Sequence, residues 1–325
     1  MEPGSSTSPE YWLHLAKRLS VGEITVLPAY PLADLTTFRI GGPGGLICPV
    51  TNTDDARRFL DFADHEDLPW ACLGGGSNLL ADDEGYAGLV LLIRTNRFEI
   101  QGDTVHVGAG WDFDTLVAET LDHGLTGLEF ASGIPGTVGG ALVGNAGCYG
   151  REIGSFLLEA TVLRPDGKVV TCGPEDFAFV YRNSDLKRRG DVVLDLVLQL
   201  ARDDLAAAGC ERQEHLEDRR RKHPTDVPCA GSYFKNLPPA APGQWRRPAG
   251  QLLEEVGAKS MHEGGAAVFA GHANIIVNRG GATSSDVLLL ADRMRAAVRT
   301  RFGEELEAEV QHLVTPSQSR TDTGD

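Results

Sequence analysis

Two glycine-rich loops hold the residues whose types and spacing could do chemistry. One has the sequence GGGSNL at residues 74–79, and the other extends over residues 127–147. Glycine adopts positive φ angles readily and lets backbone amides approach a ligand that side chains would otherwise keep away. Such amides, joined by the side chains of Ser77 and Asn78, could form an anion-binding nest. The favoured ligand of both loops is therefore a phosphate-bearing cofactor.

Glycine runs alone are weak evidence, because turns that bind nothing use the same residues. The sequence lacks G-x-x-x-x-G-K-[ST], and it has no G-x-G-x-x-G that joins a strand to a helix. Both absences disfavour the common nucleotide-binding loops, including the Rossmann dinucleotide site. Two glycine runs separated by a strand-rich segment nevertheless favour a ligand over simple turns.

The elements that must position these loops are predicted to form two lobes. Lobe 1 covers residues 21–95, with a helix at 53–66 and strands at 46–50, before Gly74 and at 89–93. Lobe 2 covers residues 96–203 and is richer in strands, with a helix near 114–123 and strands at 104–107, 160–163, 168–171 and 192–200.

A third domain is predicted over residues 204–314. A charged helix at 203–222, which Pro224 and Pro228 terminate, separates lobe 2 from the rest of this domain. Its most secure element begins at the capping box Thr283-Ser-Ser-Asp286 and ends near Gly303. An apolar stripe on this helix indicates packing on a core, and consists of Val287, Leu290, Ala291, Met294 and Val298. Residues 1–20 and 315–325 are expected to be weakly ordered tails.

Composition excludes several functional classes. The 325-residue chain has a formal charge of −16, so the basic footprint needed to attract nucleic acid or an anionic membrane is missing. No apolar run reaches the ~18 residues of a membrane span, and the N-terminus does not resemble a signal peptide. The six cysteines lack C-x-x-C spacing and are interpreted as reduced thiols. We expect a cytoplasmic protein with no required metal.

Taken together, the motifs are specific enough to identify a family. In chain order they are TTFRIGG at 36–42, GGGSNL at 74–79, GIPGTVGG at 133–140, NAG at 145–147, YRNS at 181–184, GSYFKN at 231–236, AG at 249–250, HA at 272–273, VN at 277–278 and LEAEV at 306–310. This order resembles the UDP-N-acetylenolpyruvoylglucosamine reductases, also called UDP-N-acetylmuramate dehydrogenases, over residues 32–313. Cys148, Gly44 and Leu237 depart from the family pattern and affect loop shape only.

The resemblance implies an α+β fold, in which a two-lobed FAD-binding domain of the vanillyl-alcohol-oxidase (PCMH) type precedes a C-terminal α/β substrate-binding domain. FAD would bind noncovalently, with its diphosphate on the backbone amides of the two loops. The implied cofactor-binding residues are Gly74, Gly75, Gly76, Ser77, Asn78, Leu79, Gly133, Ile134, Pro135, Gly136, Thr137, Gly139, Gly140 and Asn145. For Ser77 and Asn145, the capping of turns stays an alternative role.

The implied reaction has two steps and uses NADPH as co-substrate. NADPH reduces the flavin, and a hydride then passes to the enolpyruvyl β-carbon of UDP-N-acetylglucosamine enolpyruvate. The product, UDP-N-acetylmuramate, is a precursor of peptidoglycan. The second step needs an acid that protonates the α-carbon and groups that stabilise charge spreading into the carboxylate.

The family motifs imply a role for three catalytic residues. Ser232 matches the proton donor, Arg182 the residue that faces the substrate carboxylate, and Glu309 the catalytic glutamate. A guanidinium suits its role because it makes charge-assisted bonds and stays protonated. We expect Glu309 to lie on a strand that returns to the active site, where burial would raise its pKa. Without the family motif, a turn serine, an arginine paired with Asp185 and a surface glutamate would be the simpler interpretations.

The implied substrate-binding residues are Tyr181, Lys222, Lys235 and Asn236. Lys222 is the favoured diphosphate ligand of the run RRRK, while a solvated helix face is the simpler interpretation of its three arginines. His272 is interpreted as a buried histidine satisfied by the backbone. Two other functions stay open: a related flavin oxidase that uses O₂, and a nucleotide-binding regulatory module. The expected partners are small molecules, and the chain is expected to be a monomer.

Overall fold

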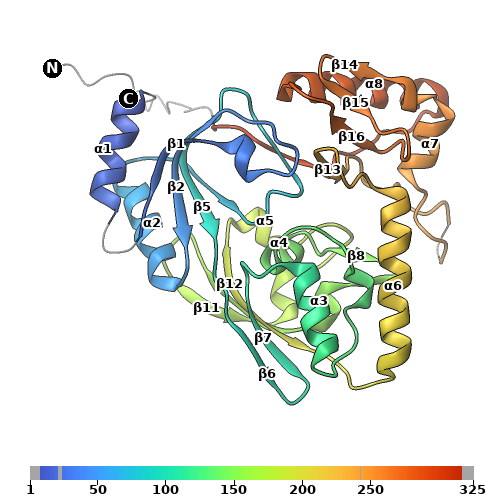
Figure 1. Ribbon diagram of the computed structural model, residues 1–325. Coiled ribbons are helices and arrows are strands. Elements are labelled where there is room, and N and C mark those ends of the chain that lie inside the picture. Colours follow the sequence, from blue (N-terminus) through green and yellow to red (C-terminus); the bar gives the residue numbers. More distant parts are fainter. Residues whose placement is uncertain (1–7, 21–23, 242, 317–325) are drawn as a thin grey trace, which may run out of the picture.

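The computed structural model describes residues 8–20, 24–241 and 243–316. Figure 1 shows the two lobes side by side, with the long helix α6 (Leu205–Lys222) beside lobe 2 and the C-terminal domain at one end. Within the described ranges, no helix is long and apolar enough to cross a membrane.

Lobe 1 is a mixed sheet with the strand order β1-β2-β5-β3. β5 runs parallel to both of its neighbours, whereas β1 pairs antiparallel with β2. The parallel strands β2 and β3 need a crossover, and α2 supplies it on one face of the sheet. The elements are β1 (Leu27–Pro31), β2 (Pro43–Val50), α2 (Thr53–His65), β3 (Trp70–Leu73), β4 (Leu79–Ala81) and β5 (Tyr86–Ile93).

The prediction of a weakly ordered tail over residues 1–20 is wrong for α1 (Pro9–Leu19). The Ser8 hydroxyl caps this helix by accepting from Tyr11 N, and proline occupies the first helical position. Its buried face, which includes Trp12 and Leu15, joins the core of lobe 1. Apolar packing therefore holds this helix, although the polar residues before it favoured the prediction of a weakly ordered tail. Residues 1–7 and 317–325 lie outside the described residues.

Lobe 2 is an antiparallel sheet with the strand order β11-β10-β12-β7-β6. One hydrophobic core runs from this sheet into lobe 1, so the two lobes are packed as one body. The main elements are β6 (Phe98–Gln101), β7 (Thr104–Gly108), α3 (Phe113–Asp122), α4 (Val138–Val143), β10 (Leu157–Leu163), β11 (Val169–Cys172), α5 (Asp185–Arg189) and β12 (Val192–Gln199). A short hairpin, β8 (Gly147–Cys148) with β9 (Arg151–Glu152), follows α4.

Helix α6 has no continuous buried apolar stripe, and Ala208 is its one buried residue. It begins after Asp204, whose side chain accepts from Ala206 N and Ala207 N, and it packs on lobe 2 against α3 and the single turn η2 (Glu129–Ala131). The predicted domain boundary at residue 204 would therefore place α6 in a different domain from α3 and η2, the elements on which it packs. The helix predicted at 203–222 is confirmed to within two residues at its start.

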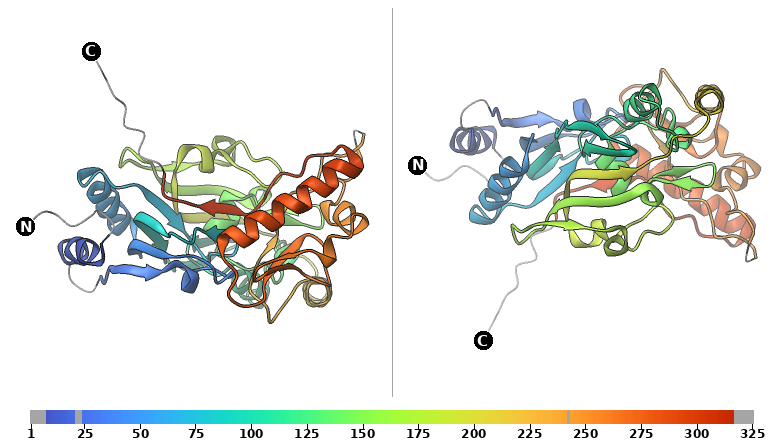
Figure 2. Two further views of the ribbon diagram at one scale, coloured as in Figure 1. Left: turned by 90° about the horizontal axis from the view of Figure 1, so that it is seen from above. Right: turned by 90° about the horizontal axis from the view of Figure 1, so that it is seen from below.

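The C-terminal domain is an antiparallel sheet covered by two helices (Figure 2). The predicted capping box at Thr283 and the buried stripe of α8 (Ser284–Phe302) are confirmed, and Gly303 ends the helix with a φ of 70°. The other elements are β13 (Cys229–Ser232), α7 (Ala249–Glu255), β14 (His262–Glu263), β15 (Ala266–Val268) and β16 (Ile275–Asn278).

The end of the chain ties this domain back to lobe 1. β17 (Gln311–Leu313) pairs parallel with β4, next to the first glycine loop. The Asp83 carboxylate accepts from the backbone N–H groups of Ser284 and Ser285 and so caps α8 from lobe 1. Phe38 and Leu80 of lobe 1 also belong to the core of the C-terminal domain. This return path brings the LEAEV motif to the glycine loops.

Candidate active site

The two glycine loops face each other between the lobes. An ideal Cβ on Gly74 would lie 2.3 Å from Thr137 Oγ1, and one on Gly136 would lie 2.5 Å from Ser77 Oγ. The Ser77 hydroxyl donates to Pro135 O over 2.9 Å. Glycine is therefore needed at positions 74 and 136 because the loops approach too closely for side chains.

A cavity of about 420 Å³, called here the catalytic cavity, lies between these loops and the C-terminal domain. Arg182, Ser232 and Glu309, which lie far apart in the sequence, line it together. Its size is within the ~300–1,000 Å³ typical of small-molecule sites. The other predicted residues in its lining are Gly74, Gly75, Gly76, Ser77, Asn78, Leu79, Ile134, Pro135, Gly136, Thr137, Gly140, Tyr181 and Asn236.

A second cavity of about 840 Å³, the adjoining cavity, shares Gly74, Pro135 and Arg219 with the first. The predicted residue Gly133 lines this one, with a φ of +70° that favours glycine. The two cavities can together hold an extended ligand. The two glycine loops leave room for close backbone contact with a diphosphate, so the residues present fit a dinucleotide such as FAD.

Two predicted cofactor residues have structural contacts instead of a place in the catalytic lining. An ideal Cβ on Gly139 would lie 2.6 Å from Ala109 Cβ, so this glycine serves close packing behind the loop. The buried Asn145 side chain donates to Val180 O over 3.2 Å and accepts from Gly154 N over 3.1 Å. These bonds give Asn145 the turn-capping role that the sequence left open.

Two predicted substrate lysines also lie outside both linings. Lys222 Nζ is 2.7 Å from Asp218 Oδ2 on the same helix, and its side chain is 57% exposed. Lys235 Nζ pairs with Glu307. The Glu307 side chain is itself exposed.

Arg182 and Glu309 meet directly in the catalytic cavity. Arg182 Nε lies 3.0 Å from Glu309 Oε1, although the N–H direction does not complete a hydrogen bond. Arg182 has a φ of +57°, which is uncommon for a residue with a side chain and is the kind of backbone strain found at functional sites. The alternative pairing with Asp185 does not occur, because Asp185 pairs with Arg188.

Glu309 is placed by the returning C-terminal segment, but it lies in the loop before β17 and not on a strand as predicted. Its backbone N–H donates to Tyr233 O over 2.8 Å, and Ala308 bridges to Phe234. Burial raises the pKa of the Glu309 carboxyl above its ordinary value, while Arg182, Lys187 and Lys235 act in the opposite direction. Desolvation outweighs three cations here, so the proton is held more tightly than on a surface glutamate.

Ser232 reaches the cavity from the last position of β13. The pairing of β13 with β16 shifts register between Cys229 and Ser232, where Gly231 has a φ of +72°. A bulge of this kind re-aims the side chain that follows it. Asn236, four residues on, accepts from Ala249 N through its side chain and lies beside the Tyr181 hydroxyl.

Two cations in the lining were missed by the sequence analysis. Arg219 of α6 lines both cavities, and burial lowers the pKa of its guanidinium. Among the described residues, no carboxylate lies within ion-pair distance of it. Lys187 of α5 lines the catalytic cavity, where burial and Lys235 lower its pKa. Arg219 follows Arg212 and Leu216 on one helical stripe, but only the position of α6 shows which side faces the cleft.

Other chemistry finds less support in the structure. No cluster of three or more His, Cys, Asp or Glu side chains suited to a metal ion occurs in residues 8–20, 24–241 and 243–316. The six cysteines are free thiols, as predicted.

Two family models match this chain. Residues 45–173 match the FAD binding domain, and residues 223–313 match the C-terminal domain of UDP-N-acetylenolpyruvoylglucosamine reductase. The second match begins after α6.

Full-length relatives agree with these matches. UDP-N-acetylenolpyruvoylglucosamine reductase 2 of Symbiobacterium thermophilum is 43% identical over 284 residues, which cover 87% of this chain and 90% of that protein. The Bacillus subtilis reductase is 37% identical over 91% of this chain and 95% of its own length. The crystal structure of the Thermus caldophilus reductase superposes with a TM-score of 0.74 at 32% identity, over 90% of this chain and 99% of that one. This chain therefore belongs to the UDP-N-acetylenolpyruvoylglucosamine reductase family.

Proposed function

We propose that this chain reduces UDP-N-acetylglucosamine enolpyruvate to UDP-N-acetylmuramate in peptidoglycan precursor synthesis, with bound FAD and with NADPH as reductant. The observation that carries the proposal is the catalytic cavity, because it collects Arg182, Ser232 and Glu309 beside the paired glycine loops. FAD, when bound, supplies a two-electron carrier between NADPH and the enolpyruvyl group.

The protein residues then manage charge and protons around that transfer. Arg182 binds the substrate carboxylate and offsets the charge that spreads into it as hydride reaches the β-carbon. The Ser232 hydroxyl gives its proton to the α-carbon, which completes the addition of one hydride and one proton across the double bond. Burial raises the pKa of the Glu309 carboxyl, which favours its protonated form, and this form donates a hydrogen bond to the developing enolate.

The cofactor contacts come from backbone groups and from one helix. Amides of residues 74–79, with those of Gly136 and Thr137, bind the FAD diphosphate. In the same loop Gly133 N donates to Asp114, Ile134 N donates to Ala131 O, and Pro135 has no N–H. Arg219 is the cation of α6 that faces this diphosphate, because it lines both cavities. Lys222, which was expected to bind the substrate diphosphate, is engaged by Asp218.

The proposal is tested by purifying the full chain and following flavin absorbance. We expect a yellow protein that releases FAD on denaturation and is bleached by NADPH. Reoxidation should then require UDP-N-acetylglucosamine enolpyruvate. A colourless protein that takes up no FAD would contradict the proposal, and rapid reoxidation by O₂ without the sugar would favour a flavin oxidase.

Replacing Ser232 separates the two half-reactions. Ser232→Ala should leave NADPH reduction intact, because the hydroxyl acts only after hydride reaches the substrate. Reoxidation by the sugar should slow by roughly 10² to 10⁴-fold, as general acid catalysis is typically worth. Ser285→Ala, on the exposed start of α8, is the matched control. Equal slowing of both half-reactions would mean that this turn is only structural.

Replacing Glu309 tests whether the proton on its buried carboxyl takes part in the reaction. Rapid-reaction measurements should show that reoxidation declines as pH rises through the raised pKa of Glu309, because the carboxyl loses its proton. Glu309→Gln should slow reoxidation and remove this dependence while leaving NADPH reduction nearly unchanged. Glu305→Gln, an exposed side chain paired with Arg299, is the control. Normal turnover in Glu309→Gln would remove this residue from the mechanism.

The monomeric state, the cytoplasmic location and the domain boundaries remain predictions. Sedimentation at micromolar concentration measures the first, and limited proteolysis near residues 204 and 223 measures which side of α6 is the domain boundary.

A further inference from the structure

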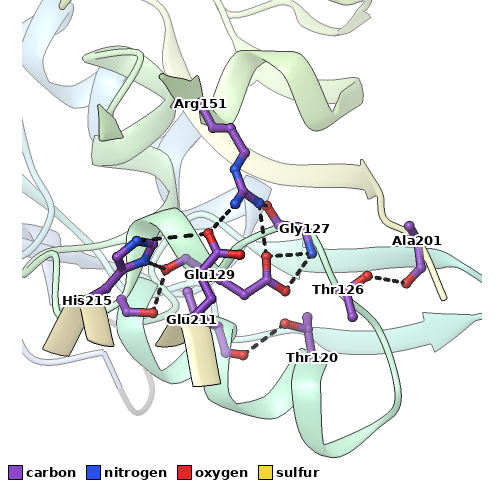
Figure 3. Close-up of polar contacts among 10 residues, drawn as sticks. Thr120, Thr126, Gly127, Glu129, Arg151, Ala201, Glu211 and His215 are labelled. Carbon is purple, nitrogen blue, oxygen red and sulfur yellow. Dashed lines mark hydrogen bonds and ion pairs between the residues drawn. The ribbon is translucent and has the colours of Figure 1, made fainter. Parts of the chain in front are cut away.

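Helix α6 is docked in an unusual way for a helix that lines a cofactor site. A helix without a continuous buried apolar stripe cannot be held on its neighbour mainly by apolar packing. With Ala208 as its one buried residue, α6 must be docked mainly by polar contacts. Figure 3 shows where the densest group of these contacts lies, around Arg151.

The Arg151 guanidinium joins two carboxylates from different elements. Its Nη1 lies 3.2 Å from Glu129 Oε2 of η2, and its Nη2 pairs with Glu211 of α6. The Glu129 side chain is only 3% exposed, and both of its oxygens accept from Gly127 N at 2.8 and 3.0 Å. A buried carboxylate needs such compensation, so Arg151 and Gly127 hold Glu129 in one orientation.

A second line of contacts on α6 runs beside the first. His215 Nδ1 lies 2.9 Å from Glu129 O, and the His215 ring stacks on Tyr149 at 3.8 Å. Arg212 Nη1 donates to Asp114 Oδ1 over 2.7 Å, and the same oxygen accepts from Gly133 N over 2.8 Å. Thus α6 is bound to the loop that carries Gly133 through Asp114 as well.

Each element that Arg151 joins either lines a cavity or adjoins a segment that does. Arg151 itself is in β9, whose partner β8 supplies Gly147 and Cys148 to the catalytic cavity. Glu129 lies a few residues before the loop 133–137, and Glu211 lies two helical turns before Arg219. At Gly133, an ideal Cβ would meet Arg219 Cδ at 2.9 Å.

From this arrangement, we propose that Arg151 is a positioning residue for FAD: it clamps β9, η2 and α6 together and thereby holds Arg219 against the second glycine loop. The inference rests on the proposed function only in placing FAD between the glycine loops. Arg151 lines neither cavity, so it acts through the walls and not by contact with the cofactor.

The test follows FAD release from the full holoenzyme on dilution, by recovery of flavin fluorescence, together with hydrogen exchange of α6 peptides. Arg151→Met keeps the length of the side chain but removes both ion pairs. We expect FAD to leave about tenfold faster, as for loss of other supporting contacts to a bound group. Exchange in α6 should also accelerate, while α8 exchange and the turnover number at saturating FAD stay unchanged.

Matched variants separate clamping from general destabilisation. Arg293→Met removes a comparable guanidinium, bonded to Glu263 and His262 O in the C-terminal domain, and should not change FAD release. Glu211→Ala removes the tie to α6, together with the contact between Glu211 and His215 on the same helix, and spares the buried Glu129. It therefore decides the matter if Arg151→Met does not fold.

The outcomes are distinguishable from failure of the proposed reaction, because FAD release does not depend on turnover of the sugar. Faster FAD release with faster α6 exchange in Glu211→Ala supports the clamp. Unchanged FAD release in Glu211→Ala, whether or not α6 exchange changes, overturns it. Faster release in Arg293→Met to the same extent would also overturn it.

Discussion

Helices α6 and α8 have 18 and 19 residues, yet they are attached to the protein by opposite means. α8 buries an apolar stripe that includes Leu290 and Met294, whereas α6 buries only Ala208 and relies on charged contacts to lobe 2. Apolar burial is strong but non-directional, while hydrogen-bonded charges fix orientation. The helix that must aim a cation at the cofactor cleft is thus the one docked by directional contacts.

The largest effect is expected from truncating a buried side chain in the apolar stripe that attaches α8. Leu290→Ala should lower the free energy of unfolding by about 2–5 kcal/mol, because a fully buried leucine leaves a cavity. Urea denaturation measures the loss. Leu289→Ala, one position away and 55% exposed, should change stability by less than about 0.5 kcal/mol. Equal losses would mean that α8 is not held by its stripe.

The next effect concerns function rather than stability. Arg219→Ala should release FAD roughly 10- to 100-fold faster, the range expected when one charged hydrogen bond is lost. Lys222→Ala should leave FAD release unchanged, because its ammonium is bound to Asp218. Flavin fluorescence after dilution measures both. Faster FAD release in Lys222→Ala but not in Arg219→Ala would assign the contact with FAD to Lys222 and would mean that α6 is rotated in solution.

A smaller effect is expected from pH at the contact between α6 and the second glycine loop. Burial alone would raise the pKa of Asp114, but hydrogen bonds from Arg212 and Gly133 outweigh it and hold this pKa below the ordinary value. A depressed pKa means that this contact stabilises the fold above the unfolded pKa and is lost as pH falls through the folded one. The difference in melting temperature between wild type and Asp114→Asn should therefore shrink on acidification. A constant difference would contradict the assignment.

The smallest effect is expected from salt. Partly exposed ion pairs are screened at ionic strengths near 1 M, where the Debye length falls to about 3 Å. Hydrogen exchange of α6 should speed up modestly between low and high salt, whereas exchange of α8 should slow or stay constant. Parallel acceleration of both helices would erase the distinction between them.

The sequence allowed α8 to be predicted closely and α6 only in extent. A capping box, an apolar period and a terminal glycine are local signals, and each depends on residues within one or two helical turns. For α6, the sequence predicted a charged helix with a solvated arginine face and favoured Lys222. The contacts that decide otherwise come from Asp114, Glu129 and Arg151, far away in the sequence.

The candidate site divides in the same way. The glycine loops could be predicted from sequence because their function depends on missing side chains, and Gly74 and Gly136 lie where the loops touch. The roles of Ser232, Arg182 and Glu309 came from family motifs, since each residue type alone has an ordinary surface interpretation. Asn145 and Gly139 support the loop from behind, and their contact with FAD, which the motifs imply, stays a prediction.

The sequence by itself determined the local conformations and the family, because propensities, caps and motif order are properties of neighbouring residues. Only the tertiary structure decided that Arg182 meets Glu309, since β17 must first pair with β4. It also decided that Arg219 and not Lys222 faces the cleft, and that the pKa of Glu309 rises, since desolvation depends on everything packed around a group. Burial and long-range pairing are properties of the whole fold, and no local pattern of residues encodes them.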